Sequence, residues 1–110
     1  MDDVERLLRL LSINDEASID RILAGAEERE FSHALGRKVN LLVRLGALLA
    51  LGAPTTSLKA TVQQAVDAGA TEAEITDVLV TVAPAVGLAR VVASAPRLAT
   101  ALGYDIDSDD

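Results

Sequence analysis

Residues 68–75 read Ala-Gly-Ala-Thr-Glu-Ala-Glu-Ile, and this stretch organises the fold around it. Gly69 is typical of the position just beyond a helix, because glycine adopts the left-handed backbone conformation without steric cost. Thr71 and Glu74 have the spacing of a capping box, in which each side chain accepts a hydrogen bond from the other residue's backbone N–H. The stretch therefore predicts a turn between two helices: Gly69 ends the first helix, and Thr71 starts the second.

Apolar residues at helical spacing predict helices on both sides of this turn. A nearly all-apolar helix is expected from about residue 37 to 51. A second helix, with one apolar and one polar side, is expected from about residue 56 to 68. Two short amphipathic helices precede them, and Asn14 is expected to cap the second. Two helices follow the turn; Pro84 should kink the first or free a carbonyl, and Pro96 should bend the second or start a new turn.

No segment alternates apolar and polar residues with the period of a strand. We therefore expect an all-α fold, an antiparallel array of about six helices. The whole chain, residues 1–110, is expected to form one domain. Its last residues, 104–110, form an acidic tail.

The composition limits both the core and the choice of partners. Half of the 110 residues are apolar, but only Phe31 and Tyr104 are aromatic, so the core must be aliphatic. A small aliphatic core favours a homo-oligomer as an added source of stability. The net charge of −7 argues against nucleic acid and an anionic membrane as partners. The chain has no cysteine and one histidine, so we expect no thiol chemistry, no metal and no cofactor.

The sequence also predicts a cytoplasmic protein without a membrane partner. The first residues, Met-Asp-Asp, lack the basic segment of a signal peptide. The longest apolar runs contain Arg44 and Arg90, whereas a membrane span needs about 20 consecutive apolar residues with few charges.

Three segments occur in an order and spacing that resemble one known family. They are Leu-Gly-Arg-Lys-Val-Asn-Leu-Leu-Val at 35–43, Ala-Gly-Ala-Thr at 68–71, and Val-Ala-Pro-Ala-Val-Gly-Leu-Ala at 82–89. Together they resemble the carboxymuconolactone decarboxylase family, which includes the AhpD-like alkylhydroperoxidases, most strongly over residues 35–103. The resemblance implies an AhpD-like helical fold and a homo-oligomer, either a trimer or a hexamer.

The same resemblance indicates where the family's reactive groups would lie. The peroxidase branch has a Cys-x-x-Cys-x-x-x-His motif, and its reactive positions correspond here to Pro54, Ser57 and Thr61. The glutamate of its proton relay corresponds to Leu41 or Leu42. Serine cannot cycle between redox states, and threonine cannot act as a general base near neutral pH. The resemblance thus implies a degenerate active site, which argues against thiol peroxidase and histidine-dependent decarboxylase activity.

Two rows of polar residues on the central helices are the candidate ligand-binding residues: Arg37, Asn40 and Arg44 in the first row, and Ser57, Thr61 and Gln64 in the second. Arginine on an apolar helix is costly unless its charge is paired or hydrogen-bonded. One interpretation is an ion pair with an acidic residue (Asp67, Glu74 or Asp77), within the chain or across a subunit interface. The other is a clamp for a carboxylate ligand.

His33 is the only side chain that titrates near neutral pH. It is expected in the connection before the first central helix. One interpretation is a surface or capping residue; the other is an acid or base at the mouth of a pocket.

Two functions remain open from the sequence. The first is a non-redox, oligomeric protein that binds a small molecule or a partner, and the missing relay favours it. The alternative is a lyase, decarboxylase or isomerase of a small organic acid that uses other residues in the same pocket. The two polar rows keep this alternative open. Assembly alone would instead predict that the polar residues pair only with each other.

Overall fold

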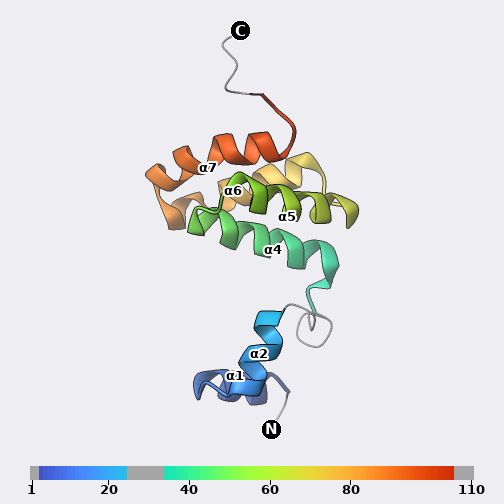
Figure 1. The fold of residues 1–110 in the computed structure, drawn as a ribbon, viewed down its shortest axis with the longest axis vertical. Coiled ribbons are helices and arrows are strands. Elements are labelled where there is room, and N and C mark those ends of the chain that lie inside the picture. The colour runs from blue at the N-terminus through green and yellow to red at the C-terminus, as the bar shows by residue number, and fades with distance from the viewer. Residues whose placement is uncertain (1–2, 25–33, 106–110) are drawn as a thin grey trace. The chain divides into compact units, whose positions relative to one another are not determined.

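A computed structural model of the chain describes residues 3–24 and 34–105 (Figure 1). Over these ranges the protein is all-helical, with six helices and no strand, as the sequence predicts. The chain separates into two compact units, residues 1–34 and 35–110. The single domain expected over residues 1–110 stays a prediction. None of the helices described is both long and apolar enough to cross a bilayer.

The first unit contains two short helices, α1 (Asp3–Ser12) and α2 (Glu16–Ala24). The cap of α2 differs from the prediction. Asp15, not Asn14, caps the helix: its Oδ2 accepts hydrogen bonds from the backbone N–H of Ser18 at 3.1 Å and from its hydroxyl at 2.8 Å. Asn14 instead has a φ of 59°, a left-handed conformation that asparagine tolerates better than most residues. It therefore forms the turn before the cap.

The second unit contains four helices: α4 (Gly36–Leu51), α5 (Thr55–Asp67), α6 (Glu72–Val86) and α7 (Leu88–Ala101). α4 packs against α5 and α6, and α7 packs against the same two helices from farther along the chain (Figure 1). Their shared core is aliphatic: Leu41, Leu45, Leu49, Leu58, Val62, Ala65, Ala70, Ile75 and Leu98. A core without aromatic rings buries little area for each residue in it.

α4 and α6 run in the same direction. Lys38, near the start of α4, contacts Glu74, near the start of α6. Gly46, halfway along α4, lies where a Cβ would come within 3.4 Å of Val78 and Val82 in the middle of α6. α5 lies between α4 and α6 in the sequence and follows α4 after the short segment 52–54. A short connection returns the chain along the preceding helix, so α5 runs opposite to both α4 and α6. Consecutive helices of the second unit therefore alternate in direction, as predicted.

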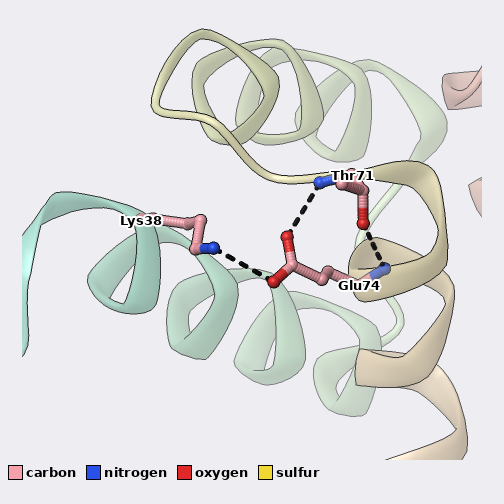
Figure 2. A network of polar contacts seen from close by, with 3 residues as sticks. All are labelled: Lys38, Thr71 and Glu74. Carbon is pink, nitrogen blue, oxygen red and sulfur yellow. Dashed lines mark hydrogen bonds and ion pairs between the residues drawn. The ribbon is translucent and has the colours of Figure 1, made fainter.

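The turn between α5 and α6 has the predicted caps. Thr71 Oγ1 accepts a hydrogen bond from the backbone N–H of Glu74 at 3.0 Å, and Glu74 Oε1 accepts one from the N–H of Thr71 at 2.9 Å (Figure 2). Gly69 has a φ of +100°, a conformation that strains residues with a side chain. The capping box and the glycine turn are thus confirmed.

Both predicted proline interruptions lie inside continuous helices. α6 continues past Pro84 to Val86, and α7 continues past Pro96 to Ala101. Proline has no N–H, so the carbonyl four residues earlier loses its helical hydrogen bond while the helix goes on. Of the two outcomes expected at Pro96, the structure shows no new helix start there.

The end of α4 is fixed by α7. Gly52 ends α4 in a left-handed conformation with a φ of 74°. Arg97 Nη1 donates to the carbonyl oxygen of Gly52 at 3.0 Å and, at 3.5 Å, to that of Ala53. The hydroxyl of Ser94 donates to the carbonyl of Leu49 at 3.3 Å. α7 thus supplies donors to carbonyl groups at the end of α4 and just beyond it, of which that of Leu49 also accepts from the N–H of Gly52.

Candidate functional site

The positions that the resemblance assigns to the family's reactive residues serve packing and helix initiation in this structure. Leu41 is 4% exposed and belongs to the core, and Leu42, the alternative position for the relay glutamate, is half-buried and packs against that core. Pro54 precedes α5 in an extended conformation and makes no side-chain cap. Ser57 is half-buried in the first turn of α5, and Thr61 is 7% exposed one turn later. A redox group and a general base are therefore absent from these five positions, which offer only the hydroxyls of Ser57 and Thr61.

Thr61 is a buried polar residue in a helix face that is otherwise apolar. Its neighbours on that face, Leu58, Val62 and Ala65, all belong to the core. Within the residues that the structure describes, its hydroxyl makes no side-chain hydrogen bond. A buried donor without a partner costs about 1–3 kcal/mol. Thr61 is thus the one predicted ligand residue whose burial calls for a bound group or a water.

The first polar row lies along α4 and faces solvent. Arg37 and Arg44 are exposed, and Asn40 is half-buried. Arg44 Nη2 donates to Asn40 Oδ1 at 3.4 Å, a long hydrogen bond. The structure therefore brings Arg44 and Asn40 together, and leaves Arg37 without a hydrogen bond to other described residues.

The second polar row, on α5, does not share one environment. Ser57 is half-buried and Thr61 is buried, whereas Gln64 is exposed. No hydrogen bond joins this row to the row on α4 within residues 34–105. The clamp formed by both rows together stays a prediction.

Two of the three acidic residues expected to pair with the arginines, Glu74 and Asp67, have other partners within the chain. Lys38 Nζ lies 3.0 Å from Glu74 Oε2, so Lys38 takes the place predicted for an arginine (Figure 2). Asp67 Oδ1 accepts a hydrogen bond from Gln63 Nε2 at 3.1 Å. Among the described residues, Arg37 and Arg44 form no ion pair. The prediction of an ion pair within the chain is therefore wrong for both arginines.

The Glu74 carboxylate accepts hydrogen bonds from two residues, the backbone N–H of Thr71 and the ammonium group of Lys38. The backbone N–H of Thr71 lowers the pKa of Glu74 most, and the ammonium group of Lys38 lowers it further. Both effects favour the charged carboxylate. Glu74 is therefore a structural anion that joins the start of α6 to α4, and it does not serve as a proton donor near neutral pH.

A groove of about 660 Å³ lies between α4 and α6. Its lining is mostly aliphatic and comprises Val39, Leu42, Val43, Gly46, Ala47, Ala50, Glu74, Asp77, Val78, Thr81, Val82, Ala85 and Val86. None of the six predicted ligand residues lines it. Sequence reasoning missed this feature, although Val39, Val43 and Ala47 form an outward apolar row spaced by four residues.

A metal site finds no support in the described ranges, where no three His, Cys, Asp or Glu residues cluster closely enough. His33, the predicted acid or base, lies outside the described residues, as do residues 106–110 of the acidic tail. The described part offers apolar surfaces, hydroxyls, carboxylates and guanidinium groups to a ligand or partner.

Comparison with known proteins agrees with the fold and with the resemblance. The model of the carboxymuconolactone decarboxylase family matches residues 17–101, which is most of the chain. No curated protein and no solved structure gives a significant match. The matched range contains the capping-box turn and the groove, and it begins within α2. The chain therefore belongs to the carboxymuconolactone decarboxylase family.

Proposed function

We propose that this protein is a non-redox, self-associating member of its family, which acts by binding and does not use the family's thiol chemistry. One observation carries the proposal: the side chains at the family's reactive positions build the fold. Leu41 and Thr61 belong to the buried interior of the second unit, and Pro54 starts α5. Nothing at these positions exchanges electrons or takes up a proton.

The reaction of a thiol peroxidase makes this argument stronger. Reducing a hydroperoxide takes two electrons, which a thiolate at a helix N-terminus supplies before a second thiol resolves the sulfenic acid. Pro54 and Ser57 stand at that helix start, and the whole chain has no cysteine. Neither the first step nor the second can occur in this protein.

Self-association is supported by the size of the core and by the surface around it. Nine buried apolar residues, all aliphatic, form the core of the second unit. Large apolar side chains remain exposed on α4, where Val39 is 43% and Val43 58% exposed. A small chain gains stability by burying such surface against another copy. A trimer or hexamer and a cytoplasmic location stay predictions.

Two assays on the full-length chain test the proposal. The first follows consumption of cumene hydroperoxide with dithiothreitol as reductant, beside a cysteine-containing family member as positive control. We expect a rate equal to that of the buffer blank. The second measures the mass in solution by sedimentation velocity at micromolar concentration, where we expect a multiple of the 11.5 kDa chain. Protein-dependent turnover, or a monomer, would contradict the proposal.

The hydroxyl of Thr61, which has no hydrogen-bond partner in residues 3–24 and 34–105, favours a second candidate function, the processing of a small organic acid. A buried hydroxyl without a protein partner is a position where a ligand oxygen can bind. Calorimetric titration with acetate, succinate and benzoate separates the candidates. Under the second function, Thr61→Val and Arg44→Ala both weaken binding of one of these acids. Under the first, wild type and both variants give no saturable heat.

A further inference from the structure

Acidic and basic residues are distributed unevenly along this chain. The chain has 17 acidic residues and a net charge of −7, but residues 45–66 and 78–104 contain no Asp or Glu. The cationic residues of these two ranges are Lys59 on α5 and Arg90 and Arg97 on α7. The two ranges include the last turns of α4 and all of α7, so they form a basic part of an acidic protein.

Two of these cations meet at the turn after α4. Arg97 Nη1 donates to the carbonyl oxygens of Gly52 and Ala53, at 3.0 and 3.5 Å. Arg90 approaches Gly52 as well, and a Cβ at that position would collide with its Nη1. The two arginines stand two turns apart on one face of α7. One rigid helix therefore holds both guanidinium groups against the same glycine.

Most of the donors of these two groups are open to a ligand. A guanidinium has five N–H donors and no acceptor. Arg97 uses its Nη1, whereas its Nε and Nη2 make no hydrogen bond to residues 3–24 or 34–105. Arg90 makes neither a hydrogen bond nor an ion pair within the same ranges. Bonding to the end of α4 thus accounts for Arg97 but gives Arg90 no partner.

We infer that Arg90 and Arg97 form a binding site for a phosphate group, carried by inorganic phosphate or by a phosphomonoester. Two like charges held at one residue repel each other, and an anion between them relieves the repulsion. A phosphate group has up to two negative charges near neutral pH and three acceptor oxygens, which the planar donors of arginine match. A carboxylate has one charge, so it balances only one of the two guanidinium groups. The inference goes beyond the proposed self-association, which uses neither arginine.

Calorimetric titration of the full-length protein with inorganic phosphate and with glycerol phosphate tests the site. We expect the wild type to bind both with saturable heat. Arg90→Gln removes one guanidinium group and leaves the hydrogen bonds of Arg97 in place, so it should weaken binding at least about tenfold. Binding of glycerol phosphate should also weaken as pH falls below about 6, where the ester loses its second charge. Tighter binding of glycerol phosphate than of inorganic phosphate would identify a phosphomonoester as the ligand.

Arg37→Gln is the matched control, because Arg37 is an exposed arginine at the opposite end of α4 from Gly52. It makes the same change in net charge and should bind phosphate as the wild type does. Circular dichroism confirms that both variants fold. The inference is overturned by a wild type that binds neither compound, by an Arg90→Gln protein that binds like the wild type, or by equal losses in both variants. Succinate bound as tightly as phosphate would overturn it too. The solution mass and the peroxidase assay test the proposed function separately.

Discussion

At the scale of single residues, the carboxylate of Glu74 makes two contacts that stabilise the fold. One of its oxygens caps α6 through the N–H of Thr71, and the other bonds the ammonium group of Lys38 on α4 (Figure 2). The first contact holds the start of a helix, and the second holds that start against a neighbouring helix. Because both contacts favour the charged form, they connect the stability of the fold to pH.

Replacing Glu74 with glutamine should remove part of this pH dependence. Glutamine keeps a capping oxygen but loses the charge that pairs with Lys38. The pKa of Glu74 is lower in the folded chain, so the unfolded chain takes up the proton first on acidification. The melting temperature of the wild type should therefore exceed that of Glu74→Gln at pH 7, and the difference should shrink as pH falls below the ordinary glutamate pKa of about 4.3.

Glu72→Gln is the control, because Glu72 lies in the same first turn but bonds Tyr104 instead of Thr71 or Lys38. If the difference in melting temperature between the wild type and Glu74→Gln stayed constant from pH 7 to pH 3, the charge of Glu74 would contribute nothing to stability.

Local sequence could predict one half of this arrangement and not the other. Thr71 and Glu74 are three residues apart, so their spacing alone predicts the capping box. Lys38 lies 36 residues before Glu74, and only the packing of α4 on α6 brings the two together. The same limit explains the wrong partners predicted for Arg37 and Arg44: charge and helical phase do not tell which neighbour a long side chain reaches.

At the scale of helices, α7 holds the end of α4 through a guanidinium group. Arg97 is half-buried and donates to two carbonyls just beyond the last turn of α4. Arg90, seven residues earlier on the same helix, is exposed and approaches Gly52 without a hydrogen bond to another described residue. The two arginines therefore offer a matched pair.

Arg97→Met should destabilise the fold by about 1–2 kcal/mol, because it leaves partly buried carbonyls without a charged donor. Arg90→Met should change the free energy of unfolding by no more than about 0.5 kcal/mol. Urea denaturation followed by circular dichroism measures both. Equal effects of the two substitutions would show that the hydrogen bonds of Arg97 do not hold α4.

The helices themselves were largely predictable. Apolar residues at helical spacing indicate each helix, and the glycine and capping residues between them indicate where each helix ends and the next begins. The bounds of α4 and α5 differ from the expected ones by one residue at most. The cap of α2 was placed one residue early, since Asn14 and Asp15 are both good caps and only backbone conformation separates them. The proline at position 96 showed where α7 loses a hydrogen bond, but not that the helix would continue.

At the scale of the molecule, the groove forms only where α4 and α6 pack together, because both helices contribute its lining. Its α4 side consists of residues that look like ordinary core positions on an all-apolar helix, and its α6 side includes Asp77 and Thr81. No pattern along one helix predicts that these sides meet and remain open. The assignment of the family's reactive positions stays a prediction, and the structure adds that two of the assigned residues, Leu41 and Thr61, are buried.

The central claim is that this chain works through self-association and not through chemistry at the positions that the resemblance assigns to the family's reactive residues. The most direct test compares the solution mass of two variants with that of the wild type by light scattering. Val43→Glu places a charge in the groove, and we predict that it reduces the assembly to the 11.5 kDa monomer. The double substitution Ser57→Ala with Thr61→Val alters the reactive positions, and we predict the wild-type mass. A Val43→Glu protein that keeps the wild-type mass, or a double variant that falls apart, would contradict the account.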